Sequence, residues 1–207
     1  MDMASIKALV ATAAALSALA STAHSAELII NGGFESNSYP GNFTELSSGV
    51  TGWTISAGSI DVINLYWQPA GGSYSIDLNG GAAATLSQAF ATNIGQLYNV
   101  SFSMAGNPDA GGAVKSIQAG VTGLTTFTFN GAGASHGAMN WQTQSFSFVA
   151  NSSLSTLTFV GDSGTGPYGA ALDNISVTAA VPEPATYGML LAGLGMLGLL
   201  ARRRRGG

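Results

Sequence analysis

Few side chains between residues 26 and 180 could carry out acid, base or nucleophilic chemistry. That stretch contains eight carboxylates, one lysine (Lys115) and one histidine (His136), and the whole chain has no cysteine. The lack of cysteine excludes a disulfide scaffold and a cysteine-ligated zinc site, and a lone histidine makes a poor transition-metal site. A glycosidase needs two carboxylates that face one cleft, and no pair stands out along this sequence.

One segment has the composition of a nucleophile loop. Gly161-Asp-Ser-Gly164 resembles the loop that carries the serine of trypsin-like proteases. A serine nucleophile also needs a general base and an acid that orients it, and His136 lacks the sequence context of that family. Because Gly, Asp and Ser also favour turns, we predict a turn at this segment and no enzymatic activity.

A second group of residues suits sugar binding. Flat aromatic faces pack against a pyranose ring, while amides and carboxylates bond its hydroxyls. Two aromatic and three amide side chains lie near the ends of predicted strands, where binding residues concentrate; they are Asn64, Tyr66, Trp67, Gln68 and Asn79. They are our candidate carbohydrate-binding residues, although the two aromatics could instead fill the end of the core.

The elements that must position these residues are short strands. Residues 26–180 show no sustained helical periodicity, and β-branched or aromatic runs alternate with Gly, Asn and Ser clusters, as is typical of a sandwich or barrel. We predict strands at 28–30, 60–65, 73–78, 85–90, 98–105, 116–121, 125–129, 142–149, 156–160 and 171–177. The pattern indicates one all-β domain, a two-sheet jelly roll.

The same region resembles a known family along its whole length. The segments that carry the resemblance are 28–35 (Leu-Ile-Ile-Asn-Gly-Gly-Phe-Glu), 52–53, 58–63, 66–80, 87–90, 98–102, 105–108 and 172–177 (Leu-Asp-Asn-Ile-Ser-Val). They are similar to the choice-of-anchor C family, a relative of a plant cell-wall domain of unknown function. The resemblance implies a galactose-binding-like jelly roll and gives no biochemical activity.

The resemblance also implies a metal site. Carbohydrate-binding jelly rolls of this kind often hold a structural calcium ion between the first segment and an Asp near the last strand, and Glu35 and Asp173 occupy the matching positions. Calcium prefers hard oxygen ligands, which an acidic domain supplies. The alternative is that both acids cap turns or accept backbone N–H bonds.

The N-terminal 25 residues predict a secretory signal peptide. Lys7 precedes an apolar run over residues 8–20, and small residues follow. We predict cleavage by signal peptidase after Ser25, with Ala23 and Ala26 as the alternative sites. The apolar run is shorter than the roughly 17 residues needed to span a bilayer.

The C-terminal residues 181–207 resemble the PEP-CTERM sorting signal of Gram-negative bacteria. The motif Val181-Pro182-Glu183-Pro184 precedes an apolar run over residues 185–201, which is long enough for a short transmembrane helix, and the arginine block 202–205. The arginines would stay on the cytoplasmic side. The resemblance implies a transient anchor in the inner membrane, cleavage by an exosortase near 182–184, and release to the envelope surface or extracellular matrix.

Charge limits the choice of partner. Charged residues make up 8% of the chain, and residues 26–180 have a formal charge of −7. Such a domain lacks the basic face that nucleic acid requires. Two hypotheses remain: a non-catalytic module that binds exopolysaccharide, and a structural matrix or surface protein that works by self-association without a sugar site.

Overall fold

The computed structural model describes residues 25–180, 188, 190–195 and 197. The predicted signal peptide, the motif 181–184, the arginine block and most of the predicted transmembrane helix lie outside these residues. Residues 188, 190–195 and 197 are helical. No helix in the described part of the chain has both the length and the apolar character needed to cross a membrane.

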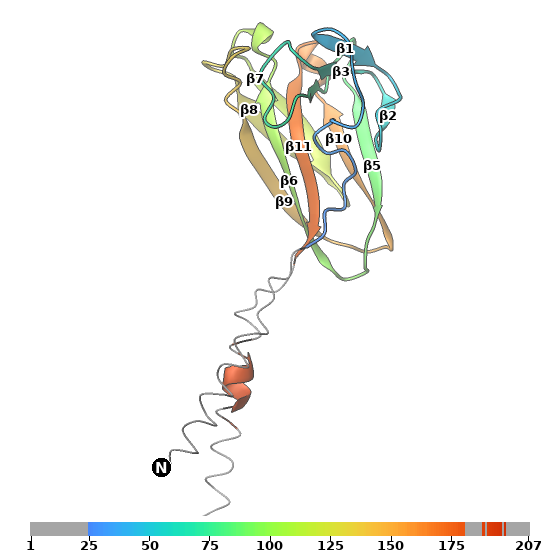
Figure 1. Cartoon of the computed structure of the whole chain (residues 1–207), viewed down its shortest axis with the longest axis vertical. Helices are drawn as coiled ribbons and strands as arrows, with labels where there is room; N and C mark the ends of the chain where they lie inside the picture. Colours follow the sequence, from blue (N-terminus) through green and yellow to red (C-terminus); the bar gives the residue numbers. More distant parts are fainter. Residues whose placement is uncertain (1–24, 181–187, 189, 196, 198–207) are drawn as a thin grey trace, which may run out of the picture. The chain divides into compact units, whose positions relative to one another are not determined.

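Residues 26–179 form one compact all-β unit made of two antiparallel sheets (Figure 1). The six-stranded sheet has the order β1 (Phe43–Leu46), β3 (Ile60–Ile63), β4 (Ser75–Asp77), β11 (Ala170–Ala179), β6 (Leu97–Gly106) and β9 (Gln142–Val149). The five-stranded sheet has the order β2 (Thr54–Ala57), β5 (Thr85–Ala91), β10 (Leu154–Gly161), β7 (Val114–Gly120) and β8 (Leu124–Asn130). Two short 3-10 helices, η1 (Pro108–Ala110) and η2 (Ser163–Thr165), lie in connections. The all-β, two-sheet prediction is confirmed.

Alternation along the strands builds the core. In β6 the side chains of Tyr98, Val100, Phe102 and Met104 are buried. The intervening residues Asn99, Ser101 and Ser103 are exposed or half-buried, as the period of two in a strand requires. Phe102 meets Phe159 of β10 edge to face, with ring centroids 5.2 Å apart. The two sheets are therefore joined by a dry aromatic and aliphatic layer.

Nine of the ten predicted strands are present, and the one at 28–30 is wrong. There the backbone N–H of Ile30 donates to Gln88 Oε1 at 2.7 Å, and Gln88 Nε2 donates to the Ile30 carbonyl at 2.9 Å. Of residues 27–30, only Glu27 and Leu28 pair with the backbone of β11, at Thr178 and Val177. At Ile30 a side-chain amide takes the place of a partner strand, and Asn31 then turns the chain with φ of 58°. The sequence pattern missed β1 and β2, which are four residues long and have only half-buried or exposed side chains.

The two longest strands define the two ends of the domain. β6 and β11 pair from Ala170 opposite Gly106 to Ala179 opposite Tyr98, so one end lies where β6 ends and β11 begins. Ten residues at about 3.3 Å each separate the two ends by roughly 30 Å. A bulge between Asp173 and Ser176 interrupts the pairing, with Asn174 in the left-handed region at φ of 49°.

Candidate functional site

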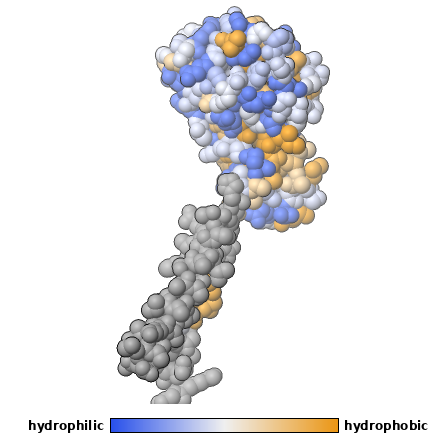
Figure 2. Space-filling view, viewed as in Figure 1, coloured by the Kyte–Doolittle hydropathy of each residue, from blue (hydrophilic) through white to orange (hydrophobic). Residues whose placement is uncertain are grey.

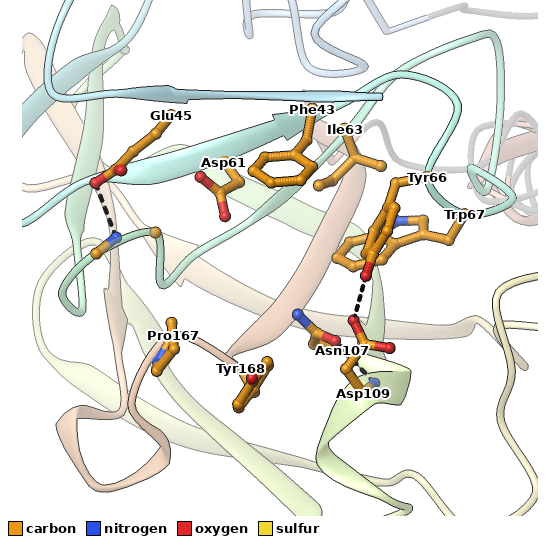
Figure 3. Close-up of a pocket in the computed structure, with 12 residues that line it drawn as sticks. Phe43, Glu45, Asp61, Ile63, Tyr66, Trp67, Asn107, Asp109, Pro167 and Tyr168 are labelled. Carbon is orange, nitrogen blue, oxygen red and sulfur yellow. Dashed lines mark hydrogen bonds between the residues drawn. The ribbon is translucent and has the colours of Figure 1, made fainter. Parts of the chain in front are cut away.

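A cleft of about 310 Å³ opens at the end of the domain where β6 ends and β11 begins. β1 and β3 form one side, and the turn at Gly80 and Gly81 closes one end (Figure 3). The segment after β3, which carries Tyr66 and Trp67, and the segments that follow β6 and precede β11 form the rest. Its lining residues are Phe43, Glu45, Asp61, Ile63, Tyr66, Trp67, Gly80, Gly81, Asn107, Asp109, Pro167 and Tyr168. The cleft therefore brings together segments more than 100 residues apart in sequence.

Strand register sets one side of the cleft. In the β1–β3 pair, Phe43 lies opposite Ile63 and Glu45 lies opposite Asp61, and opposite residues in an antiparallel pair share one face. Glu45 Oε1 accepts hydrogen bonds from Ser59 Oγ at 2.6 Å and from the Gly81 N–H at 2.9 Å. The hydrogen bond from Ser59, together with that from Gly81, lowers the pKa of Glu45. The charged side chain of Glu45 therefore connects β1 to the turn at Gly81.

Asp61 has a different environment from its neighbour. Among the described residues no hydrogen bond partner holds its carboxylate, which lines the cleft and is half-buried. Burial, with the charge of Glu45, raises the pKa of Asp61 to about 6. Asp61 is therefore an acceptor that faces the cleft and is available to a ligand.

A fully buried carboxylate lies behind this side. Asp77 accepts hydrogen bonds from the Asn79 N–H at 2.9 Å and from Asn107 Nδ2 at 2.8 Å. Burial raises the pKa of Asp77 to about 7 against the effect of these bonds. The second bond orients Asn107, whose own side-chain oxygen caps η1, so the buried carboxylate holds one lining residue in place.

Three polar side chains form a network at the aromatic end of the cleft. Tyr66 Oη donates to Asp109 Oδ2 at 2.7 Å, and His136 Nε2 lies 2.8 Å from Asp109 Oδ1. The Tyr66 and His136 rings lie 4.5 Å apart. Desolvation opposes the charge on Asp109, but the hydrogen bonds from Tyr66 and His136 outweigh it and the pKa of Asp109 is lowered. The network holds the Tyr66 ring in one orientation.

Two large aromatic side chains on the cleft remain substantially exposed. Phe43 is 50% exposed and Tyr168 is 45% exposed. Figure 3 shows Pro167 and Tyr168 across the cleft from Phe43. Aromatic faces thus lie on both sides of an opening that contains the Asp61 acceptor.

The structure separates the five candidate sugar-binding residues. Tyr66 and Trp67 line the cleft, but Trp67 is 3% exposed and its Nε1 donates to Ser75 Oγ at 2.9 Å. Asn64 Nδ2 donates to the carbonyls of Tyr39 and Gly41.

The last two candidates also lie away from the cleft lining. Gln68 is exposed, and its backbone carbonyl accepts a hydrogen bond from Trp141 Nε1. Asn79 has no exposed surface, and its Nδ2 donates to the Asp162 and Gly166 carbonyls and to Thr165 Oγ1. Asn79 therefore holds a loop, while Tyr66 is the candidate whose ring a ligand could reach.

Glu35 and Asp173 come close together, but their surroundings are those of backbone acceptors. Glu35 Oε1 accepts from the N–H groups of Ser73 and Tyr74, and Asp173 Oδ2 accepts from those of Ala70 and Gly71. One oxygen of each carboxylate is thus occupied by backbone donors, as the alternative predicted, and the calcium site, which would need six to eight oxygen ligands, stays a prediction. The described residues contain no cluster of three or more His, Asp or Glu side chains that could hold a metal ion.

The two carboxylates instead shape the loop that follows Trp67. Gly72 has φ of 61°, and a Cβ there would lie 2.2 Å from Glu35 Oε1. Glycine is required at this position because a side chain would displace the carboxylate. Glu35 and Asp173 therefore hold the loop between Trp67 and β4.

The Gly161–Gly164 segment is a turn, as predicted. Asp162 caps η2 by accepting from the Gly164 N–H at 2.8 Å, and its other oxygen accepts from Ser116 Oγ. In the described part of the chain, no hydrogen bond or ion pair joins Ser163 to His136. Asp162 is thus occupied in holding the turn.

Sequence reasoning missed the residues that define the cleft. Asp61, Asp109 and Tyr168 come from three separate segments, and only the fold brings them to one cleft. His136, which contacts Asp109 behind the lining, comes from a fourth segment. Pro167-Tyr168 within a Gly-rich stretch was the available signal, since an aromatic in a loop is a common binding residue.

Comparisons with known proteins cover both parts of the chain. Residues 27–178 match the family model described as "Protein of unknown function (DUF642)", and residues 180–205 match the one described as "PEP-CTERM protein-sorting motif". The second match confirms the predicted sorting signal and implies export and sorting by an exosortase. The narrower choice-of-anchor C assignment stays a prediction.

Individual proteins are more distant. Halomucin of Haloquadratum walsbyi is 30% identical over 165 residues, which are 75% of this chain and 2% of halomucin. CBM35 from Paenibacillus barcinonensis is 26% identical, with 68% of this chain and 100% of that chain covered and a TM-score of 0.44. The Stig cyclase Fisc from Fischerella sp. TAU is 14% identical, with 77% and 100% covered and a TM-score of 0.52. The last likeness is one of fold.

Proposed function

We propose that this chain, which belongs to the DUF642 family of proteins of unknown function, is a non-catalytic module that binds carbohydrate in the cleft between Phe43 and Tyr168. The observation that carries this proposal is the exposure of both rings on opposite sides of the cleft. Asp61, a carboxylate without a hydrogen-bond partner in the described residues, also lines the cleft. Rings pack against the apolar faces of a sugar, and Asp61 accepts hydrogen bonds from its hydroxyls.

The charge of the cleft narrows the sugar class. Glu45, Asp61 and Asp109 all line it, and no basic residue is among the lining residues. A uronic acid would bring a further negative charge beside them, which costs free energy in a half-buried site. We therefore expect neutral or amino sugars to bind better than acidic ones.

The sorting signal suggests where the ligand is met. Export by an exosortase pathway leads to the cell surface, and the exopolysaccharide of the producing organism is the polymer available there. We propose that the protein works in the envelope surface or extracellular matrix of a Gram-negative bacterium, after signal peptidase and exosortase have removed both ends.

Affinity electrophoresis of the purified chain in gels that contain the producer's exopolysaccharide tests the proposal. Tyr168→Ala removes one exposed ring and should weaken binding about tenfold, since such a contact contributes about 1.4 kcal/mol. Leu124→Ala, at a 48% exposed residue away from the cleft, is the control and should bind as the unchanged chain does. Equal retardation of all three proteins would contradict the proposal that the sugar binds in the cleft.

The structure also offers a specific feature for the self-association hypothesis. The edge strands β8 and β9 have seven and eight residues, with no charge and no proline. Uncharged long edges readily pair with another chain. The other two edges are protected, since β1 contains Glu45 and β2 has a register shift against β5.

Sedimentation of the chain without sugar tests that alternative. Thr126→Lys and Ser145→Lys place a charge on the exposed side of each edge and should abolish association if these edges pair. Gln118→Lys, an exposed position on the inner strand β7, is the matched control. A chain that stays monomeric at every concentration would exclude assembly through β8 and β9.

A further inference from the structure

The end of the domain opposite the cleft carries exposed aliphatic side chains on two connected turns. Ile94 is 72% exposed, Leu154 61%, Val149 56% and Leu97 43%. These four residues define what we call the apolar end. They lie on the turn between β5 and β6 and on the turn between β9 and β10, at the lower end of the domain in Figure 1.

The two turns form one rigid support. The Thr92 N–H donates to the Ser153 carbonyl at 3.0 Å, the Gly95 N–H to the Ala150 carbonyl at 2.8 Å, and the Ala150 N–H to the Gln96 carbonyl at 3.0 Å. Ile94 lies at the tip, directly before Gly95, whose φ of 82° makes the turn. The tip is therefore held in shape before any contact is made.

Charge is absent from this surface. Residues 91–97 and 149–154 contain no ionisable side chain. The carboxylate at this end, Glu27, is occupied by the backbone N–H of Val177 and the hydroxyl of Ser176. A hollow of about 260 Å³, lined largely by Ala26, Leu28, Ala91, Tyr98 and Ala179, opens beside the turns. Figure 2 shows hydrophobic patches on the lower part of the domain, with hydrophilic residues between them.

The predicted membrane anchor follows this end of the domain closely in the sequence. β11 ends at Ala179 at the same end of the domain, opposite Tyr98, and five residues, 180–184, separate it from the apolar run 185–201. Five extended residues reach at most about 18 Å, and the interfacial layer of a bilayer is itself roughly 5 to 8 Å thick. A chain anchored by residues 185–201 must therefore hold this end within about 13 Å of the headgroup layer.

We propose that the apolar end rests on the membrane in which residues 185–201 are anchored, with Ile94 in the interfacial region of the lipid. Uncharged turns avoid the loss of hydration that a charge would suffer there, and aliphatic side chains gain from burial among lipid groups. Because β6 and β11 run from this end to the cleft, the cleft then faces away from the membrane. The contact ends when the exosortase removes the anchor.

Single-cysteine labelling of the full chain in vesicles tests this proposal, since the protein has no cysteine of its own. Ile94→Cys carries an environment-sensitive fluorophore, and the vesicles contain lipids with a quencher in the headgroup region. Val114→Cys is the matched control: it is 61% exposed and lies beyond the Ile117–Gly161 pair at the cleft end. We expect quenching at position 94 to exceed that at 114 severalfold.

Three results would overturn the proposal. Equal quenching at both positions in chains that float with the vesicles would show that the apolar end stays away from the lipid. Unquenched label at 94 together with excimer emission from pyrene at that site would show that a second copy covers it. Chains that do not float with the vesicles would show that residues 185–201 do not anchor the protein, and the proposal depends on that anchor.

Adding Leu97→Ser and Leu154→Ser to the Ile94→Cys chain should reduce the quenching, and unchanged quenching would exclude these residues from the contact.

Discussion

The two ends of this sandwich differ in the kind of side chain that they expose. The cleft end combines aromatic rings with three lining carboxylates, Glu45, Asp61 and Asp109, whereas the apolar end presents aliphatic side chains on turns without ionisable groups. The same two strands, β6 and β11, connect both ends. One small domain can therefore direct a polar, aromatic surface at a hydrated ligand and an uncharged surface at a different environment.

The difference also concerns what holds each end together. At the cleft end, side-chain carboxylates bond backbone N–H groups and other side chains, as Glu45 bonds Gly81 and Asp77 bonds Asn79. At the apolar end, backbone groups of the two turns bond one another directly. The contacts that hold the cleft end therefore depend on the protonation of these carboxylates, whereas the backbone groups that join the two turns at the apolar end do not titrate.

The largest effect is expected where the cleft end meets the core. Trp67→Ala removes a buried indole and its hydrogen bond to Ser75, and should lower the free energy of unfolding by about 3–5 kcal/mol. Urea denaturation followed by circular dichroism measures it. A loss below about 1 kcal/mol would show that Trp67 acts at the surface of the cleft and is not part of the core.

The second effect is a pH dependence that belongs to the cleft end. Burial raises the pKa of Asp77 to about 7 and that of Asp61 to about 6. Because the folded state binds these protons more tightly than the unfolded chain, the stability they contribute is complete below about pH 4 and is lost as pH rises to about 7. Asp77→Asn should flatten the fall in unfolding free energy between about pH 4 and 7, and Asp61→Asn should flatten a smaller part, between about pH 4 and 6.

The control for that experiment lies at the apolar end. Ile94→Ser should leave the pH profile unchanged and alter stability by less than about 0.5 kcal/mol, because the side chain is 72% exposed. If Ile94→Ser changed the slope as much as Asp77→Asn does, the separation of the two ends would be wrong.

The smallest effect is expected from metal removal. Glu35 and Asp173 accept backbone N–H groups from residues 70–74, so EDTA should leave the melting temperature unchanged. A drop that added calcium reverses would confirm the calcium prediction and identify these two carboxylates as ligands.

Sequence reasoning reached the strands more easily than the site. The alternation in 98–105 predicted β6 because a period of two is a local property of the backbone. The strand predicted at 28–30 is wrong because pairing with β11 stops at Leu28, and Ile30 bonds the side chain of Gln88, 58 residues away. The Tyr66-Trp67 pair was predicted together, yet Tyr66 reaches the cleft and Trp67 is buried, a difference that local sequence does not contain.

By itself the sequence determined the class of the fold, the sorting signal confirmed at residues 180–205, and the near absence of positive charge, because these depend on composition and on short-range patterns. The tertiary structure alone decided which acids are occupied and which are available. Asp61 and Glu45 are cross-strand neighbours with opposite pKa shifts, since hydrogen bonds from Ser59 and Gly81 reach one of them and burial acts on the other. Strand register and the ends of β6 and β11 set those surroundings, and no local pattern encodes them.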